Sequence, residues 1–174
     1  MQFYDDETDN YTQNHFQLHW SEKWSEKWIT NTALHYTIGK GYFEQYREDE
    51  TLSDYNLPDF QGNAISDLVR KRWLDNDFYG FTYGLNYKPS NSLLFTLGGG
   101  YNEYRGKHFG QVIYAQFGSN GNNDRHYYDN DGFKTDFNSF LKVGYNPTEK
   151  LNLFADLQYR RVYYDVLGTD KNIN

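Results

Sequence analysis

The sequence predicts an all-β protein, an antiparallel up-and-down meander of about six long strands that forms a segment of a transmembrane β-barrel. Three observations lead to this prediction: apolar and polar side chains alternate, aromatic residues gather at both ends of the apolar rows, and short turns alternate with long connections. Alternation places successive side chains on opposite faces of a strand. Each predicted strand therefore has one apolar face and one polar face.

The clearest alternation runs through residues 133–163. The apolar row consists of Phe133, Thr135, Phe137, Ser139, Leu141, Val143 and Tyr145, followed after a turn by Leu151, Leu153, Ala155, Leu157 and Tyr159. The interleaved row consists of Lys134, Asp136, Asn138, Phe140, Lys142 and Gly144, followed by Asn152, Phe154, Asp156, Gln158 and Arg160. This pattern predicts two strands joined as a hairpin.

The same alternation predicts four further strands, near residues 11–20, 28–46, 77–88 and 92–105. Short turns are expected near 21–27, 89–91 and 147–149. A three-residue turn pairs odd-numbered residues with odd-numbered residues, which places Asp136 opposite Arg160 and Lys142 diagonal to Asp156. The segment Tyr87–Phe95 recurs as Tyr145–Phe154 with one residue inserted, so two of the hairpins are expected to share one design.

The connections on the other side are long, near residues 47–76 and 106–132. In the first, residues at helical spacing predict a short helix, namely Ile65, Leu68, Val69, Arg72 and Trp73. In the second, residues 109–117 and 125–128 predict that two strands continue to a Gly- and Asn-rich tip at 119–123. Short turns on one side and long connections on the other are typical of outer-membrane barrels.

Aromatic residues mark both ends of the apolar rows. The set near the short turns consists of Trp20, Trp24, Trp28, Tyr87 and Tyr145, and the second set consists of Tyr36, Tyr79, Tyr101, Phe137 and Tyr159. About eight residues separate the two sets, which at a rise of roughly 3.3 Å and a tilt of about 40° span roughly 20 Å. This distance is close to the apolar band of about 25 Å between the aromatic girdles of membrane barrels.

The composition of the 174 residues fits one domain and excludes several classes of protein. Hydrophobic residues make up only 37% and aromatic residues 20% of the chain, so Tyr and Phe replace much of the Leu, Ile and Val of an ordinary core. Because the chain has no cysteine, a disulfide framework and a thiolate metal site are excluded. A net charge of -7 without a basic stripe argues against nucleic acid as a partner.

Both ends of the sequence are expected to lie in loops. The first six residues are acidic and lack the apolar stretch of a signal peptide, and residues 172–174 follow a strand and a turn-prone segment. Residues 1–174 are therefore expected to be part of one barrel domain, without its plug, signal peptide and C-terminal strand. Acidic groups at 5–7, 48–50 and 129–131 are expected in solvated loops, or alternatively where divalent cations bridge to a lipopolysaccharide surface.

The sequence holds no motif for catalysis, so enzymatic activity is not expected. It lacks a nucleophile motif, a P-loop and a Rossmann glycine pattern. The predicted register places His15 beside Ala33, as part of a polar lumen lining. A metal or haem site at His108 and His126 is a lesser alternative, and otherwise no metal or cofactor is expected. The run Gly98–Gly100 is expected to leave room for a group packed inside the barrel.

Tyrosine-rich hairpins give the chain a resemblance to a known family. Residues 78–90 (FYGFTYGLNYKPS) and 93–104 resemble barrel hairpins of TonB-dependent outer-membrane receptors. Residues 131–138 and 150–160 are similar to Bacteroidetes members of this family in particular. The resemblance covers nearly the whole chain. It implies a barrel of about 22 strands, an N-terminal plug in the lumen, and import driven by the TonB complex.

The resemblance further implies that the chain is part of an outer-membrane receptor that imports a scarce nutrient: an iron chelate, haem, cobalamin or a glycan. The expected partners are outer-membrane lipid, the plug domain of the same full-length protein, indirectly the TonB complex, and a small-molecule or glycan ligand. Two alternatives stay open. One is a passive porin or surface adhesin barrel, and the other is a soluble carbohydrate-binding β-domain.

Two sets of residues are candidates for functional contacts. Near the long connections, rings that stack on ligands and cations that pair with anionic groups predict a ligand site. These residues are Tyr46, Arg47, Trp73, Tyr104, Arg105, His108, Tyr114, His126 and Tyr127. In the polar rows, four charged residues predict contacts with the lumen or the plug, namely Asp136, Lys142, Asp156 and Arg160.

Overall fold

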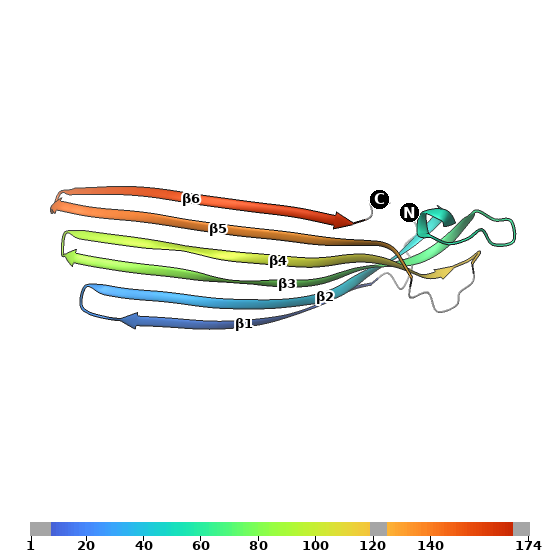
Figure 1. Cartoon of the computed structure of the whole chain (residues 1–174), viewed down its shortest axis with the longest axis horizontal. Coiled ribbons are helices and arrows are strands. Elements are labelled where there is room, and N and C mark those ends of the chain that lie inside the picture. The colour runs from blue at the N-terminus through green and yellow to red at the C-terminus, as the bar shows by residue number, and fades with distance from the viewer. Residues whose placement is uncertain (1–7, 119–124, 169–174) are drawn as a thin grey trace.

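The computed structural model describes residues 8–118 and 125–168, which form one antiparallel sheet of six strands in sequence order (Figure 1). The strands are β1 (Asp9–Lys23), β2 (Trp28–Thr51), β3 (Ile65–Ser90), β4 (Leu93–Ala115), β5 (His126–Thr148) and β6 (Leu151–Gly168). A 3-10 turn, η1 (Leu52–Tyr55), follows β2. The predicted up-and-down meander is confirmed, and the sheet is open, with β1 and β6 at its edges.

The short connections lie at one end of the sheet, here called the turn end, and η1 lies at the other, the loop end (Figure 1). Two sequence predictions, the acidic group at 5–7 and the tip at 119–123, lie outside the described residues, as do residues 172–174. Among the residues that are described, no helix has the length and apolar character needed to cross a membrane.

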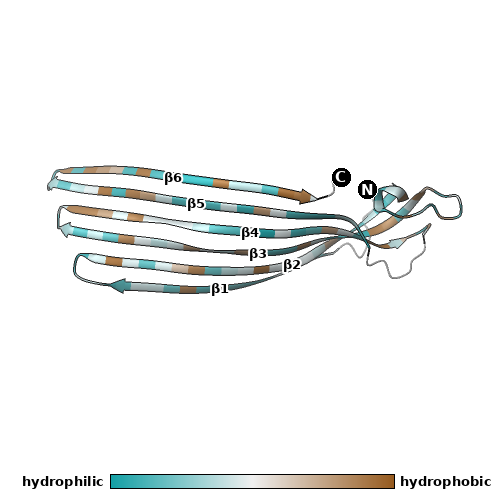
Figure 2. Ribbon diagram, in the orientation of Figure 1, coloured by the Kyte–Doolittle hydropathy of each residue, from teal (hydrophilic) through white to brown (hydrophobic). Residues whose placement is uncertain are grey.

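One face of the sheet, here called the leucine face, carries directly opposed apolar residues. Leu85 of β3 pairs with Leu97 of β4, which pairs with Leu141 of β5, which pairs with Leu157 of β6. Leu97 is 39% exposed and Leu157 is 74% exposed, because all six described strands belong to this single sheet and no second sheet covers them. The expected exposed apolar row is thus confirmed, and apolar and polar residues alternate along the ribbons (Figure 2).

The opposite face, here called the polar face, carries most of the charged and amide side chains of the turn-end half. Its residues include Gln17, His35, Asn102, Asp136, Asp156 and Arg160, which the register places on the side away from the leucines. The predicted division of the residues between two faces therefore holds across all six strands.

β2 and β3 extend much further toward the loop end than the sequence predicts, whereas the predicted continuation of two strands through residues 109–117 and 125–128 is confirmed by β4 and β5. β2, β3, β4 and β5 contain 24, 26, 23 and 23 residues, so most of the predicted connections at 47–76 and 106–132 is strand. The predicted helix around Leu68 and Arg72 is wrong, because both residues lie in β3. Side chains on both faces are packed in this part of β3, so the apolar residues do not alternate and their spacing resembles that of a helix.

The buried core lies at the loop end, where η1 and the residues after it pack on the polar face. It consists of Tyr55, Leu68, Val112, Ala115, Tyr127 and Tyr128, with Leu57 against it. Leu52 and Leu68 are completely buried. The connection after β2 therefore folds back over the sheet and covers its polar face at the loop end.

Bulges at two prolines set the register of the hairpins. The pairing shifts between Tyr87 and Ser90, around Pro89, and between Tyr145 and Thr148, around Pro147. Proline lacks the N–H that a ladder requires, so one extra residue is accommodated at each site. The predicted three-residue turns are wrong, since only residues 91–92 and 149–150 lie between the strands.

The bulges move the register by two residues from the prediction without changing the faces. Asp136 lies opposite Val162 rather than Arg160, and Lys142 lies directly opposite Asp156 rather than diagonal to it. The two hairpins share one design, as predicted, but without an insertion. Tyr145 pairs with Leu153 as Tyr87 pairs with Phe95.

The β1–β2 register differs from the prediction by four residues, since His15 pairs with Thr37 and not with Ala33. Residues 21–23, predicted as part of a turn, continue β1, where the Ser21 hydroxyl donates a hydrogen bond of 2.8 Å to Asn31. The space expected at Gly98 is also filled, because the Phe140 ring lies where a Cβ of Gly98 would be.

Candidate functional site

Three tyrosines border the leucine rows on the side of the loop end. The Tyr36 hydroxyl donates a hydrogen bond of 2.6 Å to Asp77. The hydroxyls of Tyr79 and Tyr101 donate to the two carboxylate oxygens of Glu103, at 2.5 and 2.9 Å. Asp77 lies closer to the loop end than Tyr36, and Glu103 lies closer to it than Tyr101 and directly opposite Tyr79, so none of the three hydroxyls points toward the leucines. This orientation is typical of tyrosine at a boundary between apolar surroundings and water.

A second aromatic row borders the leucines at the turn end. The rings of Trp28 and Tyr87 stack with centroids 4.0 Å apart, and Tyr87 stacks on Phe95 at 6.2 Å. Trp20 meets Trp24 edge to face at 6.0 Å. Directly paired strands thus join their rings into a belt, and the leucine rows lie between this belt and the tyrosines.

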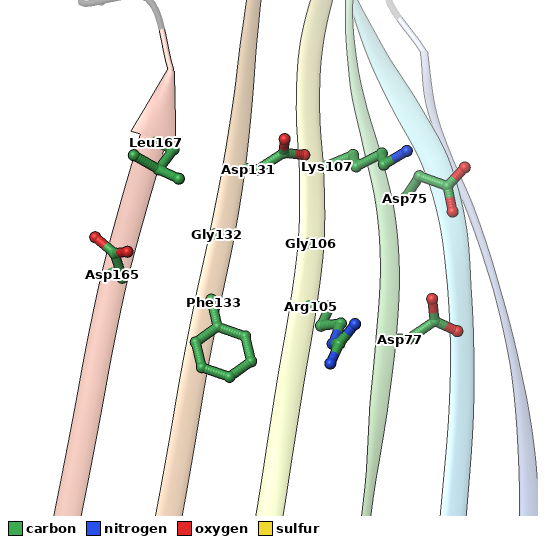
Figure 3. Close-up of a pocket in the computed structure, with 10 residues that line it drawn as sticks. All are labelled: Asp75, Asp77, Arg105, Gly106, Lys107, Asp131, Gly132, Phe133, Asp165 and Leu167. Carbon is green, nitrogen blue, oxygen red and sulfur yellow. The ribbon is translucent and has the colours of Figure 1, made fainter.

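Beyond the tyrosines the leucine face becomes charged. A hollow of about 550 Å³ lies there. Its lining residues, drawn in Figure 3, are Asp75, Asp77, Arg105, Gly106, Lys107, Asp131, Gly132, Phe133, Asp165 and Leu167. Arg105 Nη2 lies 2.7 Å from Glu103 Oε1, and Asp75 forms an ion pair of 3.0 Å with Lys40. Acidic and basic side chains of neighbouring strands therefore alternate in this zone.

Nearer the loop end, aromatic rings form a row across four strands on the same face. Ring centroids are 4.7 Å apart for Tyr42 and Trp73, 5.9 Å for Trp73 and Phe109, and 4.2 Å for Phe109 and His126. The Lys71 ammonium lies 4.1 Å from the Tyr42 ring centroid, within range of a cation–π interaction. The row holds these long strands together away from the leucine rows.

The polar face contains a hollow of about 510 Å³ across β1 to β4. It is lined by Tyr11, Gln13, His15, Gln17, His35, Thr37, Gly39, Asn76, Phe78 and Tyr104. A smaller hollow of about 270 Å³ adjoins it and shares Phe78 and Tyr104, with Asn102, Lys134 and Asp136 as its other lining residues. These two rings therefore form a ridge between the hollows.

The four residues predicted to contact a lumen or plug lie on the polar face of β5 and β6. Arg160 donates to both carboxylate oxygens of Asp136, with 3.1 Å from Nε to Oδ1. Lys142 extends over the Phe140 ring, with Nζ 4.8 Å from its centroid. The structure thus brings Asp136 and Arg160 together as the sequence predicts, although by a diagonal contact.

A network of polar groups supports the loop-end core. Arg70 is only 2% exposed and donates to the Tyr55 hydroxyl at 3.0 Å and to Gln45 at 3.1 and 3.3 Å. The Tyr55 hydroxyl donates in turn to Glu50 at 2.9 Å, and Glu50 accepts a hydrogen bond from Arg47 at 2.6 Å. Burial raises the pKa of Tyr55, which therefore stays protonated and keeps its donor role.

Tyr46 and Asp67 form a second polar contact near the loop end. The Tyr46 hydroxyl donates to Asp67 at 2.7 Å, which raises the pKa of Tyr46 to about 12. The backbone N–H of Asp49 donates to the same carboxylate at 3.0 Å, and this bond, followed by that of Tyr46, lowers the pKa of Asp67. Tyr46, predicted as a ligand residue, thus fixes the backbone at the end of β2.

The nine predicted ligand residues do not form one surface. Tyr46, Trp73, Arg105, Tyr114 and His126 lie on the leucine face, and Arg47, Tyr104, His108 and Tyr127 lie on the polar face. Tyr127 is 3% exposed and belongs to the core. Only Tyr104 lines a hollow on the polar face, and only Arg105 lines the hollow of Figure 3.

The two histidines considered for a metal or haem site lie on opposite faces. His108 is within 3.2 Å of the Tyr104 hydroxyl, whereas His126 stacks on Phe109 and contacts Asp129 at 2.6 Å. A joint site of His108 and His126 is therefore wrong. Across residues 8–118 and 125–168, no three His, Cys, Asp or Glu side chains are arranged to hold a metal ion.

The sequence prediction missed the residues that accompany Tyr104 in the polar-face hollow. Tyr11 and Gln17 lie on β1, and Asn76 and Phe78 lie on β3, so the β1–β2 and β2–β3 registers together bring them side by side. The aromatic and amide residues at alternate positions of β1 and β3 were the available signal. No protein-family model and no curated protein matches this chain.

Proposed function

We propose that the chain forms part of the wall of an outer-membrane β-barrel, and that this barrel belongs to a TonB-dependent importer of a scarce nutrient. One observation carries the proposal. The exposed leucine rows lie between two aromatic belts, and the tyrosines of one belt direct their hydroxyls to carboxylates beyond the apolar zone.

Lipid accounts for this face better than water does. The exposed leucines of β4, β5 and β6 form an apolar patch with the half-buried Leu85 of β3, and such patches mark contact with a partner or a membrane. In lipid every backbone N–H and C=O must be paired, and an antiparallel ladder closed into a barrel meets that condition. The open edges at β1 and β6 would pair with further strands of the same barrel.

The polar face supports the narrower proposal of an importer. In a barrel it would face the lumen, where the Asp136–Arg160 pair and Lys142 are available to a plug. The folded connection around η1 would narrow the lumen at the end that faces the exterior. Coupling to the TonB complex would then supply the energy for import, as the family resemblance implies.

Cell fractionation and uptake test the proposal in two steps. We expect the protein in the outer-membrane fraction, soluble only in detergent, and faster on an electrophoretic gel before boiling than after it. Recovery from the soluble fraction without detergent would contradict the barrel and favour a soluble β-domain. Uptake of the nutrient that survives both deletion of TonB and a protonophore would indicate a passive porin, and a barrel without uptake would indicate an adhesin.

A further inference from the structure

The hollow on the polar face is lined by described residues other than the acidic and strongly basic types. Among the ten described residues that line it, none is Asp, Glu, Lys or Arg. Its lining combines three aromatic rings, Tyr11, Phe78 and Tyr104, with amide, hydroxyl and imidazole groups. Its volume of about 510 Å³ lies within the range of roughly 300–1,000 Å³ that is usual for small-molecule sites.

Hydrogen bonds hold two of the rings in place. The Asn76 amide nitrogen donates to the Tyr11 hydroxyl at 2.6 Å, and the Tyr104 hydroxyl donates to the Asn76 carbonyl oxygen at 3.1 Å. Asn76 on β3 thus fixes one ring on β1 and another on β4. The site is built before a ligand arrives, which reduces the entropy lost on binding.

The third ring offers an open surface. Phe78 is 39% exposed, and the His35 ring, whose Nε2 donates to Asn102 Oδ1 at 2.8 Å, packs beside it with centroids 5.0 Å apart. An exposed phenyl ring held from one side presents its free surface to the hollow. Gln17 and Gln13 lie across the hollow from it, on β1, and each amide can both donate and accept.

We propose that this hollow binds a neutral carbohydrate, which deepens and rests on the proposed importer function by naming its substrate class. A sugar ring has an apolar C–H surface that fits an aromatic ring, and hydroxyls that donate and accept at once. An anionic iron chelate or haem needs cations to pair with its carboxylates, and the lining supplies none. Uncharged amides and rings match a ligand without charge.

The test uses the intact protein in mild detergent, titrated with neutral hexasaccharides of glucose, mannose and xylose, and separately with ferric citrate and haem. We expect saturable binding of a hexasaccharide, and about tenfold weaker binding in Phe78→Ala, because ring stacking is lost. Phe81→Ala is the matched control, since Phe81 lies on the same strand, is 38% exposed and faces the leucine side. Gln17→Ala weakens binding as well, and it serves if Phe78→Ala assembles poorly.

Three results would overturn the inference: no hexasaccharide binds, sugar binding is unchanged in both variants, or ferric citrate or haem binds and loses affinity in Phe78→Ala. Failure of the proposed function is a separate result, because fractionation measures it without a sugar. If the protein is a membrane barrel but binds none of the three hexasaccharides, only the proposed carbohydrate site is contradicted. A soluble protein that binds a sugar through Phe78 contradicts only the barrel.

Discussion

The Tyr83 hydroxyl on β3 donates a hydrogen bond of 2.9 Å to the Ser139 hydroxyl on β5, across the intervening strand. This contact is possible because Gly99 of β4 lies beneath the phenol, with the position of its missing Cβ only 3.0 Å from the Tyr83 hydroxyl. A glycine on the leucine face therefore allows a side chain to join strands that are not neighbours. The backbone oxygen of Asn138 would also clash with a Cβ there.

Gly99→Val is therefore expected to destabilise the sheet by on the order of 1–3 kcal/mol through overpacking. The midpoint of heat-induced unfolding on an electrophoretic gel measures the change. Gly144→Val is the control, because a Cβ at Gly144 would meet nothing within 4 Å. Equal midpoints for the two variants would show that the Tyr83 contact does not constrain β4.

A charge on the leucine face is expected to interfere with membrane insertion. Leu157→Arg places a cation among exposed leucines and is expected to cost roughly 2 kcal/mol, as found for lipid-facing positions of barrels. Gln158→Arg is the matched control on the next residue of β6, which faces the polar side. Folding yield into lipid vesicles is the measurement, and equal yields would contradict lipid contact at Leu157.

The buried hydroxyl of Tyr55 is expected to stabilise the folded connection after β2. Tyr55→Phe removes an acceptor of Arg70 and a donor to Glu50, which is expected to cost about 1–3 kcal/mol locally. Limited proteolysis between residues 52 and 64 reports this loss. Tyr159→Phe, at a 60% exposed side chain, is expected to leave cleavage unchanged. Resistance of Tyr55→Phe equal to that of the wild type would contradict this role.

His108 is expected to make the loop-end half sensitive to acid. Burial, followed by the charge of Arg72, lowers the pKa of His108 from its ordinary value of 6.5. The folded state thus favours the neutral ring, so the stability from this residue is present above pH 6.5 and is lost as the pH falls through the lowered folded pKa.

Hydrogen exchange of residues 104–115 is therefore expected to speed up below pH 6.5 beyond its intrinsic pH dependence. His108→Gln removes this extra sensitivity, and His19→Gln, on the exposed strand β1, retains it. The same acid response in both variants would assign it to another group.

The faces of the sheet could be predicted from sequence, whereas the register could not. Leu141 and Lys142 alternate whatever residue pairs with them, so period two fixes which side each one takes. The offset between strands depends on Pro89 and Pro147, whose bulges add one residue to one strand of each hairpin. A two-residue turn with an adjacent bulge and a three-residue turn without one contain the same residues, so the sequence does not distinguish them.

Which residues lie together in a candidate site depends on the register between strands, so these groups could not be predicted from sequence. Tyr104 could be chosen as an exposed ring near a long connection, but its partner Asn76 and the Tyr11 ring come from strands whose offset was unknown. Tyr127 is also a tyrosine near a long connection and could be chosen in the same way as Tyr104. In the structure it is covered by Tyr55, with ring centroids 4.8 Å apart. The fold of the connection around η1 determines that Tyr127 is buried while Tyr104 lines a hollow, and no local sequence pattern predicts this fold.

The length of β3 determines how far the proposed barrel would extend beyond the membrane. From Tyr79 in the tyrosine belt to Ile65, the strand runs roughly 45 Å, which at a tilt of about 40° rises roughly 35 Å beyond the apolar zone. That height exceeds the hydrocarbon thickness of a bilayer, about 30 Å. In the proposed barrel, β2 to β5 would thus project beyond the membrane as paired strands and lift the capture surface above the surrounding lipid headgroups.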